Sequence, residues 1–327
     1  LKRVWRFNSM HIHSLIFKEL IKRGYSLDGN TRIWNIADSK LWYITPVQAK
    51  AYLDLVSSED YKRRVGPKEL TLLRKHLTDI VKEVGTKPVN IIDLGCGNGK
   101  KAALFLEEMK NRNMRAKYCP IDISSYMVNE AINEIEKMKW ISDTEIIKVQ
   151  WNISDFENLQ NVVPLLKKGD YKLNFFLLLG NTLGNFETHE LLYNVRNSMR
   201  DGDIILIGNG LNNHKVEEDI VRSCRENPLR DEFFSLILQL AGFKKNQIQY
   251  GVRFRNDRLE TFYTILTDIS LSFQDRTIEF YKGDQIVVAF AYHYEKSEFM
   301  GYLKMYFGNV QLHVSEDSSY TLALCRK

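Results

Sequence analysis

Hydrophobic and polar positions follow different periods along the chain. Over residues 1–60, apolar residues recur at helical spacing in 14–23 and again in 46–56, and the segment 24–30 between them is rich in turn residues. We therefore predict that residues 1–60 form an N-terminal segment of helices and loops.

Residues 61–212 alternate between short apolar runs and amphipathic segments. The runs predict strands, at 89–94, 117–121, 145–149, 173–179 and 203–207. The segments between them predict helices, at 69–84, 100–109 and 126–138. This rhythm indicates an α/β fold, with a doubly wound, mostly parallel, Rossmann-like sheet covered on both faces.

The rhythm changes after residue 212. A predicted helix at 230–240 is followed by alternating β-rich stretches, listed here as 247–254, 260–273, 277–281 and 285–294. We interpret residues 213–295 as a β-rich insert. The predicted helix 296–307 and strands 310–314 and 320–324 make residues 296–327 the closing part of the core sheet.

Composition narrows the function classes. The net charge of +5 comes from scattered residues, which argues against a nucleic-acid partner. The four cysteines form no CxxC pair, so we expect neither a zinc site nor a disulfide framework. No apolar run approaches the roughly 20 residues that span a bilayer, and no signal-peptide core is visible at the N-terminus. These features predict a cytoplasmic protein without a membrane or metal partner.

A glycine-rich turn carries the strongest chemical signal. Asp93 ends a predicted buried strand, and Gly95, Gly97 and Gly99 follow before a predicted helix. Glycine permits the tight turn and a close approach of the backbone to a ligand. The spacing is GxGxG instead of the GxGxxG of dinucleotide enzymes, and the acid suits the cationic end of S-adenosylmethionine. A structural β–α turn and an NAD-dependent oxidoreductase remain alternatives.

Acidic residues also follow the next two predicted strands. Asp122 is placed to accept hydrogen bonds from ribose hydroxyls, and Asp155 to accept one from the adenine amino group, with Phe156 packed on the ring. A helix N-cap is the alternative for both acids. Together with Asp93, these residues form a pattern of acids after three successive strands, which resembles that of the class I methyltransferases.

The end of the fourth predicted strand extends the resemblance. Residues 178–185 match the FLGSTIGN motif of the histidine-specific methyltransferase family, and residues 93–97 and 120–124 match its DLGSG and PVDIS motifs. Bacterial members trimethylate the α-amino group of histidine on the route to ergothioneine, and related fungal members methylate prenylated tryptophan. The YYPT motif is matched by residues 42–45, and FYDxxGS falls on 24–30 without its aspartate.

The resemblance implies a set of site residues. Cofactor contacts fall on Gly95, Asp122, Asp155 and Phe156, with Gly180 in the matched loop. Acceptor contacts fall on Tyr43, Asn185 and Tyr25. Asn185 would hold the carboxylate or amino group of the acceptor, and Tyr43, Tyr25 and His293 would be candidates to orient an amine or accept its proton through water. The N-terminal segment would thus contribute to the substrate site. An ordinary loop asparagine is the alternative for Asn185.

One departure concerns the acceptor. The family holds the histidine ring with a Glu and a Ser, which our alignment replaces with Phe290 and Tyr292. An aromatic site does not accept an imidazole N–H as a carboxylate does, which argues against free histidine. Tyr292 and Tyr294 are expected to contact the acceptor, and simple strand packing is their alternative.

The sequence therefore predicts an S-adenosylmethionine-dependent methyltransferase that N-methylates an amino acid or a related small amine. Two other functions stay open. A macromolecular acceptor would use the basic residues Lys2, Arg3 and Arg6 and the run 62–64 for docking, and a non-catalytic module would bind the cofactor without turnover.

Overall fold

The computed structural model describes residues 2–58, 66–138, 147–149, 152–166, 170–212 and 217–327. The chain divides into two compact units. Unit 1 comprises Leu1–Leu55 and His214–Ala291, and unit 2 comprises Val56–Asn213 and Tyr292–Lys327. The predicted docking run 62–64 and the first two residues of the predicted strand 145–149 lie outside the described residues.

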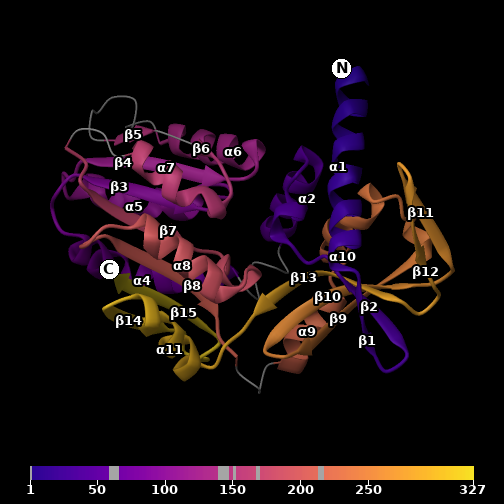
Figure 1. The fold of residues 1–327 in the computed structure, drawn as a ribbon. Helices are drawn as coiled ribbons and strands as arrows, with labels where there is room; N and C mark the ends of the chain where they lie inside the picture. The colour runs from indigo at the N-terminus through magenta and orange to yellow at the C-terminus, as the bar shows by residue number, and fades with distance from the viewer. Residues whose placement is uncertain (1, 59–65, 139–146, 150–151, 167–169, 213–216) are drawn as a thin grey trace. The chain divides into compact units, whose positions relative to one another are not determined.

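Unit 2 is built on a mostly parallel sheet (Figure 1). Its parallel strands are β3 (Val89–Leu94), β4 (Ala116–Asp122), β5 (Ile147–Val149), β6 (Asn152–Ile153), β7 (Leu173–Leu178) and β8 (Ile204–Gly210). Two antiparallel strands, β15 (Tyr320–Arg326) and β14 (Asn309–Val314), extend it beyond β8. The order is β14-β15-β8-β7-β3-β4-β5, with β6 also paired to β4. This arrangement confirms the predicted fold class.

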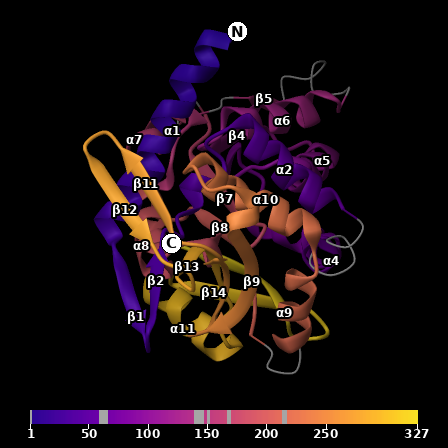
Figure 2. The same cartoon turned by 90° about the vertical axis from the view of Figure 1, so that its right-hand side faces the viewer.

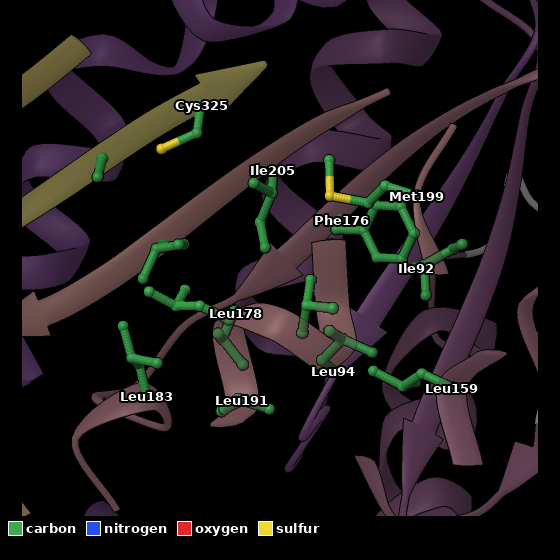
Figure 3. Close-up of a cluster of buried hydrophobic side chains, with 14 of the residues drawn as sticks. Ile92, Leu94, Leu159, Phe176, Leu178, Leu183, Leu191, Met199, Ile205 and Cys325 are labelled. Atoms are coloured by element: carbon green, nitrogen blue, oxygen red, sulfur yellow. The ribbon is translucent and has the colours of Figure 1, made fainter. Parts of the chain in front are cut away.

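Helices cover both faces of that sheet. The side chains of α4 (Gly66–Val84) and α5 (Lys100–Asn111) bury one face, joined by Ile135 of α6 (Ser125–Glu136). The other face is buried by α7 (Leu159–Leu166), α8 (Thr188–Ser198) and α11 (Lys296–Tyr306). Figure 3 shows this second core, where Ile92 of β3, Phe176 of β7 and Ile205 of β8 point into one apolar cluster. Burial on both faces explains why the strands read as continuous apolar runs.

The order in which successive strands join the parallel sheet reverses at β3. The chain runs outward from β3 to β4 and β5, then returns to place β7 on the other side of β3. In doubly wound sheets, ligands bind at the carboxyl ends of the strands on either side of such a switch point. Gly95 is the first residue after β3 and Gly180 the second residue after β7, so both glycines lie at this position.

Unit 1 contains a second sheet of order β1-β2-β13-β10-β9. Its strands are β1 (Tyr25–Asp28), β2 (Thr31–Asn35), β9 (Ile248–Arg255), β10 (Arg258–Ile265) and β13 (Gln285–Tyr292). A separate hairpin is formed by β11 (Ile269–Phe273) and β12 (Arg276–Phe280) (Figure 2). The described helices of this part are α1 (Lys2–Arg23), α2 (Pro46–Ser57), α9 (Glu217–Arg225) and α10 (Pro228–Leu240).

Two sequence expectations in unit 1 are wrong in detail. The N-terminal segment is not only helices and loops, because Gly29 and Asn30 close the β1–β2 hairpin and β2 pairs in parallel with β13. All four residues of β1 are exposed, so no burial alternation marks it in the sequence. The predicted strand 260–273 is two strands, since β10 ends at Ile265 and β11 starts at Ile269 in a different sheet.

Within the described residues, no helix combines the length and apolar character needed to cross a membrane. The same part of the chain contains no group of three His, Cys, Asp or Glu side chains arranged to hold a metal ion.

Candidate functional site

The glycine turn connects β3 to α5 in a left-handed backbone conformation. Gly95, Gly97 and Gly99 have φ values of 69°, 53° and 72°. A methyl group on Gly99 would lie 2.9 Å from the Cα and carbonyl oxygen of Ala131, so this glycine allows α5 to pack against α6. A methyl group on Gly97 would meet nothing within 4 Å. The backbone at Gly97 is therefore open to a ligand.

Asp93 is a buried carboxylate beneath this turn. Tyr118 of β4 donates a hydrogen bond of 2.8 Å from its hydroxyl to Oδ2 of Asp93. Burial raises the pKa of Asp93 to about 6, while the Tyr118 hydrogen bond and the charge of Lys101 lower it. A desolvated acid of this kind is poised to gain from a cationic ligand group.

Asp122 is a second buried carboxylate, at the end of β4. Its Oδ1 accepts a hydrogen bond of 2.9 Å from the backbone nitrogen of Ser124, and the backbone N–H groups of Gly97 and Ile123 also donate to the carboxylate. Burial raises the pKa of Asp122 to about 6. The N-cap of α6 is Ser124, so Asp122 itself does not serve as the cap.

Asp155 and Phe156 follow β6 and lie at the same edge of the sheet. Asp155 caps a 3₁₀ turn, accepting 3.2 Å and 3.0 Å hydrogen bonds from the backbone and side-chain nitrogens of Asn158. The Phe156 ring lies 5.3 Å from the Phe186 ring, and its Cζ is 3.6 Å from where a methyl group on Gly95 would sit. Phe156 thus borders the glycine turn, while Asp155 has the capping role that was its alternative.

Gly180 follows β7 with φ of 79° and carries a contact that the sequence reasoning missed. Its backbone nitrogen donates a 2.7 Å hydrogen bond to Oε1 of Glu69 on α4. Lys101 of α5 forms an ion pair with Glu69, and its Nζ is 2.8 Å from where a methyl group on Gly180 would sit. One signal was available, because Lys101 is a cation in the first turn of a helix, where the helix dipole disfavours it.

Asn185 ends a 3₁₀ turn, Leu183–Asn185, in the loop after β7. Asn181 in the same loop has φ of 60°, and its Oδ1 accepts a 2.7 Å hydrogen bond from the backbone nitrogen of Gly210 at the end of β8. A methyl group on Gly184 would lie 3.0 Å from the carbonyl oxygen of Tyr292. The loop that carries Asn185 is therefore held by β8 and by the segment at Tyr292.

Tyr292 and Tyr294 pack against each other within unit 2. Their rings are stacked with centroids 5.3 Å apart. The Tyr292 hydroxyl donates to the Glu187 carboxylate at 3.2 Å, and the Tyr294 hydroxyl is 2.6 Å from Oγ1 of Thr188. Tyr294 is buried, and burial raises the pKa of its hydroxyl. Tyr294 thus has the packing role that was its alternative, whereas Tyr292 is only partly buried.

Tyr43 and Tyr25 belong to unit 1. Tyr43 sits in an aromatic cluster, 5.3 Å from the Tyr52 ring and 6.0 Å from the Phe233 ring. Tyr25 is half exposed, with its ring 5.1 Å from Trp34 and 4.8 Å from the guanidinium of Arg32.

Phe290 of β13 is buried in the same unit. The guanidinium of Arg258 lies 5.2 Å from the centroid of its ring. Arg258 is in turn fixed by a 3.0 Å hydrogen bond to the buried carboxylate of Glu260. The position aligned with the family's ring-binding Glu therefore carries an aromatic ring with a cation beside it.

These acids and glycines lie at the carboxyl ends of the parallel strands, where doubly wound folds bind ligands. A comparison with known protein families supports a ligand site at this position. The family model described as histidine-specific, SAM-dependent methyltransferase matches residues 61–327. The chain belongs to this family. Membership confirms the predicted cofactor, S-adenosylmethionine (SAM), and the predicted enzyme class, a methyltransferase. The match does not include Tyr25 and Tyr43, and the role of every site residue stays a prediction.

Similar proteins with descriptive names include two fungal ones. The N-methyltransferase fsqC of Aspergillus fumigatus is 25% identical over 229 residues, which is 67% of this chain and 60% of the relative. Ergothioneine biosynthesis protein 1 of Schizosaccharomyces pombe is 22% identical over 167 residues, which is 50% of this chain and 21% of the relative. The aligned region therefore covers only part of each of these relatives.

Solved structures with which the chain aligns include two complexes. The plantazolicin methyltransferase BpumL in complex with SAH is 17% identical, with a TM-score of 0.39 and coverage of 97% of this chain and 99% of that one. The DhpI-SAM-HEP complex is 13% identical, with a TM-score of 0.39 and coverage of 86% and 93%.

Proposed function

We propose that this protein transfers the methyl group of SAM to the amine nitrogen of an amino acid or a related small amine. The observation that carries the proposal is the pair of buried carboxylates, Asp93 and Asp122, on either side of the Gly95 turn. Family membership supports the methyl donor. The name of one relative, an N-methyltransferase, supports nitrogen as the acceptor atom.

The side chains at the carboxyl ends of the parallel strands fit the chemical groups of SAM. Asp122 would accept hydrogen bonds from the ribose hydroxyls, and Asp93 would oppose the positive charge of the amino-acid end. Phe156 offers a ring face for adenine beside Asp155. The turn at Gly95 and Gly97 lets the ligand approach the backbone, with Gly99 supporting the helix behind it.

When bound, SAM supplies an electrophilic methyl carbon on a sulfonium. The nitrogen lone pair of the acceptor forms the new bond to that carbon while the carbon–sulfur bond breaks and its electron pair stays on sulfur. A protonated acceptor must therefore lose a proton to water before transfer, because an ammonium nitrogen has no lone pair. The protein contributes alignment, because an in-line displacement depends on the orientation of the two reactants.

On the acceptor side, we propose that Asn185 and Tyr292 hold the amino-acid-like substrate, with Tyr294 as the packing support of Tyr292. The resemblance to the family makes Tyr43 and Tyr25 further candidates for acceptor contacts. The contact between Arg258 and Phe290 supports an acceptor other than free histidine. A neighbouring guanidinium disfavours an imidazolium, and a phenyl ring has no oxygen to accept an imidazole N–H.

Calorimetric titration with SAM tests the cofactor site. Wild-type protein should bind, and Asp122→Ala should lose most of the affinity. Asp170→Ala is the matched control, because Asp170 is an exposed carboxylate of the same unit that pairs with Arg115. A folded wild type that does not bind SAM would contradict the proposal.

A methylation screen tests the acceptor. The protein is incubated with methyl-labelled SAM and single amino acids and amines, histidine and tryptophan included, and products are identified by mass. Transfer to the nitrogen of one amine supports the proposal. Turnover confined to protein or RNA would favour the macromolecular alternative, and SAM binding without any turnover would favour a binding module.

A further inference from the structure

Glu69 is a buried carboxylate outside the proposed SAM contacts. It lies in the first turn of α4, and 5% of its side chain is exposed. Its Oε1 accepts two 2.7 Å hydrogen bonds, one from the backbone nitrogen of Gly180 and one from the hydroxyl of Tyr320. Its other oxygen pairs with the ammonium of Lys101. One side chain thus joins α4, α5, β15 and the loop after β7.

Glu69 and its partner Lys101 differ in how far their side chains are exposed to solvent. Desolvating a carboxylate is unfavourable unless charged and polar partners surround it, and Glu69 has such partners on both oxygens. Lys101, by contrast, keeps 33% of its side chain exposed. An ammonium has three N–H donors, so the ion pair with Glu69 leaves donors available toward the open side.

Lys101 lies close to the candidate cofactor site. Its Nζ lies 2.8 Å from the methyl position of Gly180, which places the ammonium directly over the loop after β7. Gly95 on the other side of the switch point is close to the same loop, since its methyl position is 3.4 Å from the Thr182 side chain. The charge of Lys101 also acts on Asp93, whose pKa it lowers.

We propose that Glu69 is a positioning residue of the cofactor site. It fixes the Lys101 ammonium so that its remaining N–H groups face the amino-acid end of SAM, which carries a carboxylate beside its ammonium, and it anchors the loop after β7 through the Gly180 N–H. This inference rests on the proposed function. Without the Glu69 charge, the flexible Lys101 side chain loses its fixed orientation and the loop after β7 loses an anchor.

A purely structural tie would also destabilise the protein when broken, so the test needs a matched control. Asp203 provides it at the start of β8, at the opposite edge of the same sheet. It is buried and accepts hydrogen bonds of 2.9 Å and 2.6 Å from the backbone and side chain of Asn174, and one of 2.8 Å from the backbone nitrogen of Arg200. Asp203→Asn therefore removes a comparable buried charge far from the glycine turn.

The experiment compares Glu69→Gln with Asp203→Asn by thermal denaturation and by calorimetric binding of two ligands. SAM has the amino-acid end, and methylthioadenosine has the same nucleoside without it. Both substitutions should lower the melting temperature. Only Glu69→Gln should weaken SAM binding, by roughly tenfold, as expected for the loss of a charge-assisted contact. Its affinity for methylthioadenosine should stay within about twofold of wild type.

Lys101→Met extends the test to a second side chain. Because Lys101 is partly exposed, its substitution is less disruptive to folding than that of the buried Glu69. It should weaken SAM selectively, and Glu69→Gln should add little in that background, because both changes remove one interaction. Unchanged SAM affinity in Glu69→Gln, or an equal loss for both ligands, would overturn the proposal. If Glu69→Gln does not fold, equal loss of both ligands in Lys101→Met overturns it. Failure of the wild type to bind SAM would instead contradict the proposed function.

Discussion

The hydroxyl of Tyr118 donates a 2.8 Å hydrogen bond to Oδ2 of Asp93, and both side chains are buried in adjacent strands of the parallel sheet. Two opposing effects meet at this carboxyl. Burial raises the pKa of Asp93, the Tyr118 hydrogen bond lowers it, and the result is a pKa of about 6. Asp122 at the end of the next strand also has a pKa of about 6, with burial as the main cause.

The affinity for SAM should fall as the pH drops below about 6. The cofactor requires both carboxyls in their ionised form, and the unliganded protein protonates them in that range. Each protonated carboxyl should reduce the affinity by about tenfold per pH unit well below its pKa. Calorimetry between pH 5 and 8 measures the profile. Methylthioadenosine should show the shallower slope of Asp122 alone, and a flat profile for both ligands would count against these roles.

Tyr118→Phe should move the midpoint of the SAM affinity profile to higher pH. The substitution keeps the ring and removes the hydrogen bond that lowers the pKa of Asp93, so the carboxyl protonates more readily. The methylthioadenosine profile serves as the internal control and should not move. A midpoint that shifts to lower pH would show that the Tyr118 hydroxyl does not favour the ionised carboxylate.

Gly97→Ala and Gly99→Ala should separate binding from folding. Both positions have a left-handed backbone, which an alanine adopts at a penalty of about 1–2 kcal/mol. Gly99→Ala also forces a methyl group to 2.9 Å from the Ala131 backbone, so it should lower the melting temperature more. Gly97→Ala should weaken SAM binding with the smaller loss of stability. The reverse ranking in thermal denaturation would contradict the packing argument.

Asn181→Gly should weaken the binding of the acceptor more than the binding of SAM. Glycine tolerates the φ of 60° at this position but loses the hydrogen bond to the backbone nitrogen of Gly210. The loop that presents Asn185 then loses an anchor, and the KM for the acceptor should rise several-fold, in line with about 1 kcal/mol for one hydrogen bond. The control is the SAM dissociation constant, which should change little. An unchanged acceptor KM would separate Asn181 from the acceptor site.

The contribution of a histidine pair to the stability of the protein should fall as the pH drops through the histidine range, against the opposite contribution of Asp93 and Asp122, whose raised pKa values favour the folded state at lower pH. His76 of α4 and His313 of β14 are stacked with ring centroids 4.0 Å apart, and burial lowers the pKa of each below its usual value of 6.5. The unfolded chain then binds protons more readily than the folded one, so this contribution is present above about pH 6.5 and is lost below it. Relative to wild type, the melting temperature of His313→Gln should therefore rise as the pH falls from 7.5 to 5, and a difference that does not depend on pH would contradict this assignment.

Local patterns were enough for the core strands and for the acids that follow them. The predicted strand 89–94 coincides with β3, because a strand buried on both faces is a continuous apolar run. The glycine turn was readable for a similar reason, since its conformation depends on residues next to one another in the chain. The β1–β2 hairpin was missed because its exposed strand carries no periodic signal.

The α/β core, the glycine turn and the order of acids after the strands each depend on neighbours within a few residues, so local patterns in the sequence were enough to predict them. Contacts between distant groups depend on the folded chain. Glu69 reaches Gly180 across 111 residues and Tyr320 across 251, and no local period encodes such contacts. The packing of Phe290 beside Arg258 depended in the same way on folding, because strand pairing brings together side chains that the sequence keeps apart.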